Sequence, residues 1–459
     1  MWVNRNSVIW LPRLYPWELL LRNKHLLAVG VLSVLLCLSL VVSVEADAAM
    51  WARTYGGPGH DRAFSLIATS DGGYALAGTT ESPVARDLDF WLVKTDSVGN
   101  LEWTRTYGGT EDDVARSLVA TPDGGYAVAG VWNTSTDYWL DHYFGGDIWL
   151  VKTDKLGNMQ WNKTYGGADF AVARSLIVTS DGGYALAGST GELLSGVRDF
   201  WLFKTDAAGN AEWNQTYGRG SWNEAFYSLV ATSDGGYALA GVRRDDFWLV
   251  KTDSVGNAEW NRTYGGADAE EAYSLIPTSD GGYALAGFKG IPHLSADFWL
   301  VKTDSYGNEQ WNRTYGGAGE DFAYSLVATS DGGYALAGYW NYYYTLGILD
   351  MGLLLHGDCY LVKTDQLGNM EWNRTYGGAT VLDGAYSLLE TRDGGFALAG
   401  YCDYSIGFKI EGSVRTGDIW LIKTDELGVV PELPAWMMLP SLMILTLTAS
   451  MLFRRRERT

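Results

Sequence analysis

The chain contains seven near-copies of one unit between Trp51 and about Gly428. Each copy carries close variants of three motifs, W-x-R-T-Y-G-G, S-L-x-x-T-x-D-G-G-Y-A-L-A-G and D-F-W-L-V-K-T-D. A fixed repeat of this size predicts stacked supersecondary units, none of which can bury its apolar face alone. Residues present in every copy are therefore expected to be scaffold, and specific activity is expected where the copies differ.

Each unit is expected to hold four short β-strands, because its segments are rich in Val, Ile, Thr, Tyr, Phe and Trp and are separated by turn residues. In the first unit, residues 65–70 and 74–78 flank an Asp-Gly-Gly turn, and residues 90–96 and 103–107 flank a Ser-Val-Gly-Asn turn. Both connections have the composition of hairpin turns. No segment of the repeats has a helical period. The pattern predicts an all-β, seven-bladed β-propeller with four antiparallel strands per blade.

The register of the repeats also predicts how the ring closes. The repeated region, 51–428, begins with a lone W-x-R-T-Y-G-G segment, Trp51–Gly57, and ends with a lone D-I-W-L-I-K-T-D segment, Asp418–Asp425. Neither segment has its usual hairpin partner beside it in the sequence, and each is the partner strand that the other lacks. Pairing of the two segments would complete the last blade from both termini and lock the ring.

The motif Asp96-x-x-Gly99-x-x-x-Trp103 recurs in later units, for example from Asp154 to Trp161. With this motif the chain resembles propellers of the quinoprotein-like, tryptophan-docking kind, and surface-protein repeats with T-Y-G-G, S-D-G-G-Y and K-T-D-x-x-G-N signatures. The resemblance covers all of the repeated region and implies the propeller architecture. It implies no single activity, because one fold can host many functions, and we predict no cofactor.

The first 49 residues do not resemble the repeats. Four basic residues precede an uncharged apolar run, residues 26–44, and Ala46-Asp47-Ala48 follows it. This order is typical of a secretory signal with a small-residue cleavage site. The apolar run is also long enough for an uncleaved anchor, so we expect residues 1–49 to be a signal peptide or a signal anchor.

The other end of the sequence predicts a membrane anchor. After a short linker, 429–434, residues 435–453 are apolar or small and long enough to form a transmembrane helix. The basic tail, 454–459, is expected to stay in the cytoplasm. This end resembles a PEF-type C-terminal sorting signal of archaeal surface proteins, with Leu433 in place of the usual Phe. We therefore expect the propeller to lie outside the cell, attached to the cell membrane.

All variation in loop length is expected on one face of the ring. The spacing from the Y-A-L-A-G glycine to the aromatic residue of the third strand varies from 7 to 22 residues, whereas the other turns are uniform. Variable loops are a natural binding surface. In the second, sixth and seventh blades they are rich in aromatic residues, which suit sugar rings or protein partners or could instead pack on one another. The candidate ligand-binding residues are Trp132, Tyr138, Trp139, Tyr143, Trp340, Tyr342, Tyr343, Tyr344 and Tyr404.

Recurrent charged residues are interpreted mainly as scaffold. Aspartates such as Asp89 open the third strands, and further carboxylates such as Asp113 follow the T-Y-G-G motifs. They could bind Ca²⁺ through oxygen ligands or, as we favour, accept hydrogen bonds from loop amides. Calcium-loop spacing and the zinc spacings H-x-x-H and C-x-x-C are absent, and no metal site is predicted. Recurrent lysines such as Lys94 are expected to pair with strand or turn carboxylates.

Two further features depend on an extracellular location. Cys359 and Cys402 fall near the variable face in neighbouring blades, where they could form a disulfide. Asn133 heads an N-T-S sequon in a variable loop and is the best candidate for glycosylation.

The formal net charge of −20 and the absence of a Lys/Arg stripe exclude nucleic acid as a partner. We predict a non-catalytic, membrane-anchored propeller that binds a glycan or a protein at the cell surface through the loops of blades 2, 6 and 7. A polysaccharide hydrolase or lyase that uses rim carboxylates is one alternative. A structural cell-envelope component is another, and quinone-dependent oxidation is suggested by the resemblance alone.

Overall fold

The computed structural model describes residues 50–430 except 58, 83–86, 138–141, 145, 167–169, 192–197, 219–223, 292–294, 318, 347–352, 378–382 and 404–416. The predicted signal segment, 1–49, the predicted transmembrane helix, 435–453, and the basic tail, 454–459, lie outside the described residues. None of the described residues belongs to a helix with the length and hydropathy of a membrane span.

The described residues form an all-β fold without a helix, as predicted, and most of the sheets have four antiparallel strands. One sheet has the order β1 (Trp51–Tyr55), β29 (Gly417–Lys423), β28 (Phe396–Asp403) and β27 (Asp383–Glu390). Another sheet runs β2 (Asp61–Ala68), β3 (Tyr74–Glu81), β4 (Leu88–Thr95) and β5 (Leu101–Tyr107). The next sheet holds β6 (Asp112–Ala120), β7 (Tyr126–Asp137), β9 (Asp147–Thr153) and β10 (Met159–Tyr165), with β8 (His142–Phe144) paired to β7.

The remaining sheets repeat the same meander. One contains β11 (Phe170–Val178), β12 (Tyr184–Gly191), β13 (Arg198–Thr205) and β14 (Ala211–Tyr217), and another contains β15 (Glu224–Ala231), β16 (Tyr237–Arg243), β17 (Asp246–Thr252) and β18 (Ala258–Tyr264). The eight-stranded sheet contains β19 (Ala269–Pro277), β20 (Tyr283–Ile291), β21 (Ser295–Thr303), β22 (Glu309–Tyr315), β23 (Glu320–Ala328), β24 (Tyr334–Leu346), β25 (Leu353–Thr364) and β26 (Met370–Tyr376). Its two meanders are joined through one parallel pairing, between Ala296 and Glu320.

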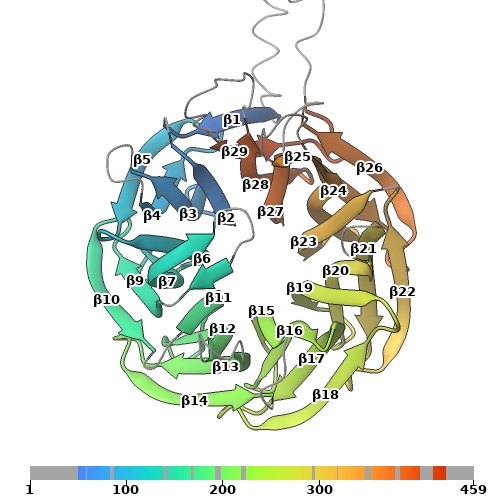
Figure 1. Ribbon diagram of the computed structural model, residues 1–459, viewed down its shortest axis with the longest axis horizontal. Helices are drawn as coiled ribbons and strands as arrows, with labels where there is room; N and C mark the ends of the chain where they lie inside the picture. The colour runs from blue at the N-terminus through green and yellow to red at the C-terminus, as the bar shows by residue number, and fades with distance from the viewer. Residues whose placement is uncertain are drawn as a thin grey trace, which may run out of the picture. The chain divides into compact units, whose positions relative to one another are not determined.

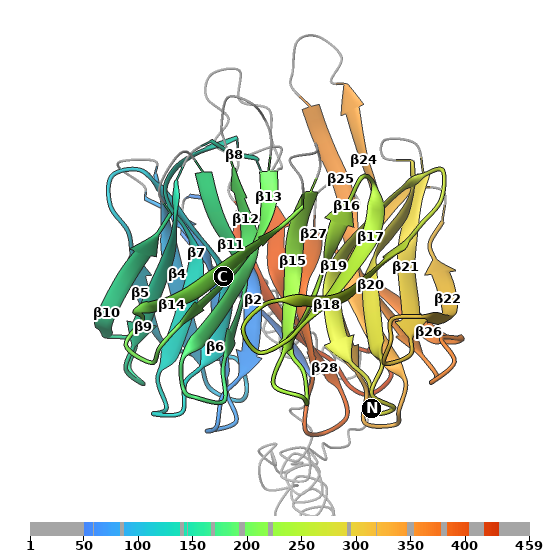
Figure 2. The ribbon, with the colours of Figure 1, turned by 90° about the horizontal axis from the view of Figure 1, so that it is seen from below.

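The sheets are arranged radially as a β-propeller. In Figure 1 the first strand of each meander (β2, β6, β11, β15, β19, β23 and β27) lies nearest the centre, and the last strand lies at the periphery. Figure 2 shows the ring from the side, with β24 and β25 extending beyond their neighbours on the face where β8 lies. This is the face of the connections between second and third strands, whose length the sequence predicts to vary.

The Y-A-L-A-G motif explains how neighbouring sheets pack. Alternate residues of a strand point to opposite faces of its sheet. In β3, Ala75 and Ala77 join a core cluster with the following sheet, whereas Leu76 joins a cluster with the preceding one. Because the second strand is buried on both sides, small side chains on one face accept the large residues of the next blade. Each fully buried Leu or Phe contributes about 1.5–3 kcal/mol.

Hydrogen bonds between blades confirm the predicted closure. On the inner strands, the serine of each S-L motif accepts the backbone N–H of the leucine in the next blade; the last of these contacts joins Leu66 N to Ser387 Oγ at 3.1 Å. At the periphery, the Tyr55 hydroxyl donates to the Gly99 carbonyl at 2.7 Å. Strand β1 pairs with β29, with Trp51 opposite Lys423. The first and last strands thus lie side by side in one sheet (Figure 1).

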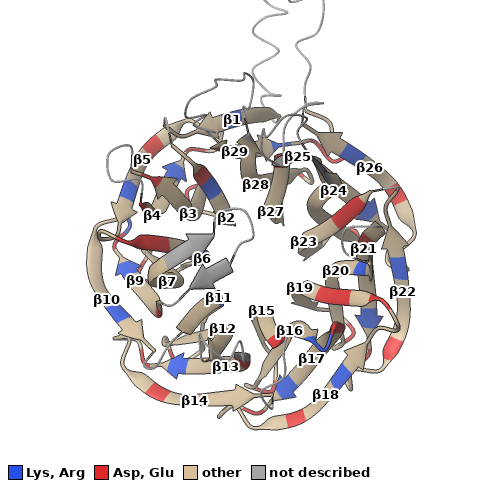
Figure 3. Ribbon diagram, viewed as in Figure 1, with Lys and Arg blue, Asp and Glu red and all other residues tan. Residues whose placement is uncertain are grey.

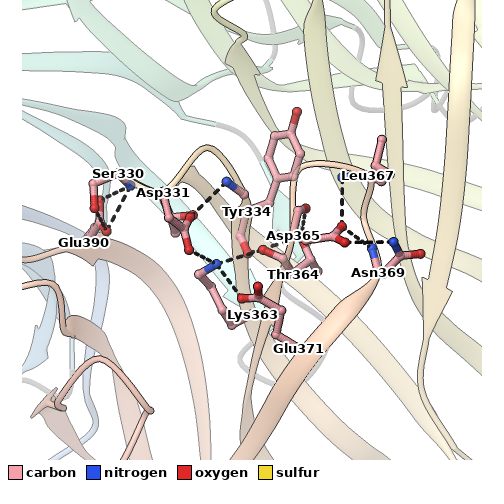
Figure 4. A network of polar contacts seen from close by, with 12 residues as sticks. Ser330, Asp331, Tyr334, Lys363, Thr364, Asp365, Leu367, Asn369, Glu371 and Glu390 are labelled. Atoms are coloured by element: carbon pink, nitrogen blue, oxygen red, sulfur yellow. Dashed lines mark hydrogen bonds and ion pairs between the residues drawn. The ribbon is translucent and has the colours of Figure 1, made fainter.

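The recurrent lysines have the scaffold role predicted for them. Figure 4 shows the network around Lys363, whose Nζ lies 2.7 Å from Asp331 Oδ2 and 2.9 Å from Glu371 Oε2, and donates to the Thr364 carbonyl. Lys94 makes equivalent ion pairs in the first repeat. Each lysine is buried and ties a hairpin turn to its own sheet. Acidic and basic residues alternate around the outer strands (Figure 3), which leaves no basic stripe there.

Candidate functional site

Every inner strand has a β-bulge directly before its serine. In β2 the register with β3 shifts between Ala63 and Ser65, and the same shift occurs at the equivalent place in β6, β11, β15, β19, β23 and β27. A bulge inserts one extra residue and re-aims its side chain. The bulge residues, which we name the inner girdle, are Phe64, Arg116, Arg174, Tyr227, Tyr273, Tyr324 and Tyr386.

The girdle side chains contact one another from blade to blade. The Phe64 ring lies 4.9 Å from that of Tyr386, which lies 5.0 Å from Tyr324. Tyr324 stacks on Tyr273 at 4.8 Å, and Tyr273 meets Tyr227 edge to face at 4.9 Å. Because these residues belong to the innermost strands in Figure 1, the contacts follow the inside of the ring. Each side chain is partly exposed, so the girdle forms an aromatic lining around the propeller axis.

Two arginines complete the girdle on neighbouring blades. The Arg116 guanidinium carbon lies 4.0 Å from the Phe64 ring centroid, and that of Arg174 lies 4.8 Å from the Tyr227 ring centroid. Both distances are within the range of cation–π contacts. All seven positions therefore carry a planar group, five aromatic rings and two guanidinium groups.

A carboxylate lies next to the girdle on β19. The hydroxyls of Tyr227 and Tyr273 donate to Glu271 Oε2 at 3.2 and 3.1 Å. Burial raises the pKa of Glu271, while the two hydroxyls and the charge of Arg174 act in the opposite direction. Glu271 thus orients two girdle tyrosines and partly balances the charge of one girdle arginine.

A tyrosine cluster links the girdle to the second strands β24 and β28. The Tyr339 ring is buried and leaves no room for a Cβ at Gly384 on the next inner strand. Its hydroxyl lies 3.0 Å from that of Tyr386. Tyr342, one of the predicted ligand-binding residues, packs at the edge of this cluster 6.1 Å from Tyr339, and Tyr401 stacks on Tyr386 at 6.0 Å. Among the predicted residues whose side chains the structure describes, Tyr342 is the one that joins this cluster with the girdle residues Tyr324 and Tyr386.

Two other predicted residues pack against their own blade. The Trp132 ring lies 6.2 Å from Trp149, and the Trp340 ring lies 4.5 Å from Tyr360. In another blade the equivalent position holds Arg243, which lies over Trp248 at 4.9 Å. Trp132 and Trp340 therefore cover the recurrent third-strand aromatic ring of their own blade, and their role in binding stays a prediction.

The remaining predicted residues are described in part or not at all. Tyr143 belongs to β8, and Tyr343 and Tyr344 belong to β24, where they pair with His356 and Leu355 of β25. Their side chains lie outside the described part of the structure, as do the whole residues Tyr138, Trp139 and Tyr404. Their role in binding stays a prediction.

Asn133 has a backbone role in addition to its predicted glycosylation. Its φ of 58° is left-handed, a conformation that Asn tolerates better than most residues, and its N–H donates to Asp113 Oδ1 at 2.8 Å. The side chain is exposed. Cys359 and Cys402 are both buried, and no disulfide joins them among the described residues. Burial raises the pKa of the Cys359 thiol well above its usual value.

The carboxylates of the predicted rim form buried pairs. At the first glycine of the T-Y-G-G motif, Gly108, a Cβ would collide with both Asp89 and Asp113, so the two carboxylates converge there. Asp113 also accepts the Gly109 N–H at 3.0 Å, as expected for a loop-ordering carboxylate. Burial, opposed by these hydrogen bonds and reinforced by Asp89, raises the pKa of Asp113 to about 7. The Asp113 side chain is fully buried, so it has no access to a substrate.

Two carboxylates converge in the same way at five other turns, whereas at Gly166 the described residues place Asp147 alone, with Ala171 at the position of the second carboxylate. Within the described residues, no group of three or more His, Cys, Asp or Glu side chains could hold a metal ion.

The inner girdle was missed by sequence reasoning. Its members directly precede the repeated Ser-Leu dipeptide, where the copies read Phe, Arg, Arg, Tyr, Tyr, Tyr and Tyr. If side chains alternated strictly along the inner strand, this residue would point into the interface between neighbouring sheets. The bulge that re-aims it has no signature in one sequence, but a variable planar residue within an otherwise repeated motif was an available signal.

The comparisons with known proteins give no family assignment. No protein-family model matches the chain. The regulatory protein FlaEY of Caulobacter vibrioides is 28% identical over 187 residues, which cover 38% of this chain and 18% of FlaEY. The chain therefore spans less than a fifth of the length of that relative.

Several solved structures are similar to the chain at low identity. They include YCF48 bound to a D1 peptide, with 13% identity, a TM-score of 0.46 and coverage of 82% of this chain and 96% of that one. Sqt1 from Chaetomium thermophilum has 12% identity, a TM-score of 0.45 and coverage of 80% and 88%. The Pan2 WD40 domain of Neurospora crassa has 8% identity, a TM-score of 0.41 and coverage of 69% and 91%.

Proposed function

We propose that this chain is a non-catalytic, seven-bladed propeller that binds a glycan along its axis, between the inner girdle and the variable face. The observation that supports this proposal is the girdle itself. Around it the blades are near-identical, while the bulge positions hold Phe, Arg or Tyr and the connections of the variable face differ in length. Inward side chains that differ between copies, together with loops of variable length on one face, are expected of a binding surface on a repeated scaffold.

The chemistry of the girdle favours a saccharide over a folded protein. Its partly exposed planar groups present flat apolar area together with polar edges, which matches the faces and hydroxyls of sugar rings. The girdle lies on the innermost strands, so a single polymer chain reaches it more readily than a protein surface does. Tyr342 would extend this surface outward, together with the predicted aromatic residues of blades 2, 6 and 7 whose side chains lie outside the described part of the structure.

The proposed location follows from the ends of the sequence. A basic segment before an apolar run, and a second apolar run before a basic tail, support export and anchoring of the propeller at the outer side of the cell membrane. The tryptophan-docking motif supports a quinoprotein-like origin for the repeat, and the Pro-Glu segment before the last apolar run supports an archaeal sorting signal. Among the described strands, two meanders in the eight-stranded sheet and one in each other sheet support the count of seven blades.

A glycan panel tests the proposal. The full-length protein in detergent would be applied to immobilised polysaccharides and oligosaccharides, and hits would be measured by titration calorimetry. Tyr324→Ala removes a ring that contacts Tyr273 and Tyr386, and we expect it to weaken binding roughly tenfold or more, as for a stacking aromatic anchor. Circular dichroism and an unfolding curve would confirm that the variant is folded.

The matched control is Tyr306→Ala. Tyr306 is 68% exposed in a uniform turn, far from the girdle in the fold, and its loss should leave affinity unchanged. Absence of any carbohydrate ligand, or equal effects of the two substitutions, would overturn the proposal; capture of a protein partner instead would support the other class of ligand.

A further inference from the structure

The outermost strands carry N-x-T sequences that the proposed function does not use. In Figure 1 the last strand of each meander lies at the periphery, and in five blades its sequence is a variant of W-N-x-T-Y. The residue between Asn and Thr is Lys, Gln or Arg and never Pro. This is the acceptor sequence for N-linked glycosylation of an exported chain. The asparagines are Asn162 in β10, Asn214 in β14, Asn261 in β18, Asn312 in β22 and Asn373 in β26.

The strand places both acceptor residues on one exposed face. Residues i and i+2 of a strand point to the same side, roughly 6.5 Å apart along it. In β10 Asn162 and Thr164 are exposed, whereas Trp161 and Tyr165, which alternate with them, are partly buried. The same Asn and Thr positions are exposed in β14, β18, β22 and β26. A bulky polar substituent on these asparagines would therefore extend into solvent at the rim of the ring.

The two ends of the asparagine amide have different surroundings. Asn162 Oδ1 accepts the indole Nε1–H of Trp149 at 3.3 Å, and the equivalent bond occurs in β18 and β22. Nδ2 lies 3.2 Å from the sulfur of Met159, an exposed and flexible side chain that can turn aside. Because N-glycosylation uses Nδ2 and leaves Oδ1 intact, the glycan and the tryptophan contact are compatible.

The outer strand also forms without asparagine at this position. In the first blade Thr104 pairs with Val93, as Asn162 pairs with Val151 in the second. In the closing strand β1 the residue is Ala52, opposite Ile422. Both strands keep the threonine two residues further on. The packing of the blade therefore does not explain why the other five copies carry an exposed asparagine.

We propose that these five asparagines are N-glycosylation sites, which place oligosaccharides around the outer rim of the propeller. This proposal rests on the proposed location outside the cell and is independent of glycan binding by the girdle. The donor is an oligosaccharide linked to a lipid phosphate. Nδ2 forms a bond to the anomeric carbon of the donor and loses one proton, while the bond from that carbon to the phosphate oxygen breaks and the lipid phosphate leaves. The glycans would also cover exposed apolar side chains such as Met159 and Met370.

Glycopeptide mapping tests the proposal on protein purified from the cells that export it. Mass spectrometry should find an oligosaccharide on the peptides that contain the five asparagines and none on the peptide that contains Thr104. Thr164→Val keeps Asn162 and its bond to Trp149 but removes the hydroxyl of the acceptor sequence, so modification should be lost at Asn162 and kept at the other four sites. Thr164→Ser should retain it.

The matched control is Thr106→Val, which removes the equivalent exposed hydroxyl from the first blade, where no asparagine precedes it. It should leave the pattern of modification unchanged. Labelling of intact cells with a membrane-impermeant amine reagent reports the location of the ring separately. A labelled ring with five unmodified asparagines overturns this inference and leaves the proposed location standing, whereas a ring protected from the reagent overturns both. Modification of Asn162 that survives Thr164→Val overturns the assignment to the N-x-T sequence. The test of glycan binding by Tyr324→Ala is decided independently.

Discussion

Paired carboxyl side chains at the T-Y-G-G turns are expected to make the stability of the propeller depend on pH. Asp89 and Asp113 converge on Gly108, and the pKa of both carboxyls is raised, first by burial and then by neighbouring carboxylates. Two such groups in a buried site cannot both ionise without a cost. At the equivalent turn of the next blade Asp147 faces Ala171, so the repeat supplies an internal comparison between a pair and a single carboxylate.

We predict that stability falls as pH rises from about 5 to 8. A carboxyl whose pKa is raised in the folded state binds more protons when folded than when unfolded, so its contribution is complete below the unfolded value near 4. That contribution is lost as pH rises through the folded value, which is about 7 for Asp113 and about 6 for Asp321. Urea unfolding at several pH values would measure the slope.

Asp89→Asn should flatten this slope, because the amide can donate to the Asp113 carboxylate at every pH. Asp147→Asn is the control, since among the described residues Ala171 takes the place of the second carboxylate there, and it should leave the slope unchanged. A wild-type protein whose stability is constant or rises between pH 5 and 8 would contradict the assignment of the pairs.

At the level of single elements, the second and third strands of a blade have two roles, one in the core and one on the variable face. Their repeated parts form the core between blades, and their extensions rise from the variable face. In β24 and β25 the division lies near Tyr342: Tyr339 is buried against Gly384, whereas Tyr343 pairs with His356 beyond a register shift. Loop length is therefore not a guide to which residues are scaffold.

Replacing residues 343–356 by a short Gly-Ser turn should leave the unfolding midpoint close to that of the wild type. Replacing 339–357 also removes Tyr339 and Tyr342 from the tyrosine cluster, and we expect a loss of about 3–5 kcal/mol, as for removal of a large buried ring. Thermal and urea unfolding of the two variants, side by side, would test this. Similar stability in both would show that the cluster does not support the blade.

The element scale also shows what the sequence could reveal. Turn chemistry and the Y-A-L-A-G alternation were sufficient to predict the hairpins and the lone strands at each end, because both depend on local periodicity. The girdle depended on a bulge, a one-residue change of register that arises from pairing with the neighbouring strand. Trp132 and Trp340 were predicted from the loops of the variable face, but their partners, Trp149 and Tyr360, lie on a strand whose distance along the chain varies between blades.

At the scale of the whole molecule, the ring depends on one noncovalent joint. Its core clusters link each sheet to the next, and the one that joins the last sheet to the first contains Trp51 and Tyr55 of β1 together with Leu76 of β3. Trp51 docks on the turn at Gly99 and lies edge to face with Tyr74 at 5.7 Å. Closure of this kind protects every sheet edge at once.

Trp51→Ala should therefore destabilise the protein by about 3–5 kcal/mol, the usual cost of truncating a buried tryptophan, and should lower the cooperativity of unfolding as the first and last blades separate. Trp103→Ala is the matched comparison, because Trp103 docks on Gly157 and Tyr126 in the same way inside a continuous stretch of chain. Both variants would be followed by urea unfolding and by limited proteolysis. If the joint holds the ring, Trp51→Ala exposes β29 and the strands beside it to protease, whereas Trp103→Ala costs stability without this selective exposure. A Trp51→Ala protein as stable as the wild type would mean that β1 contributes nothing to closure.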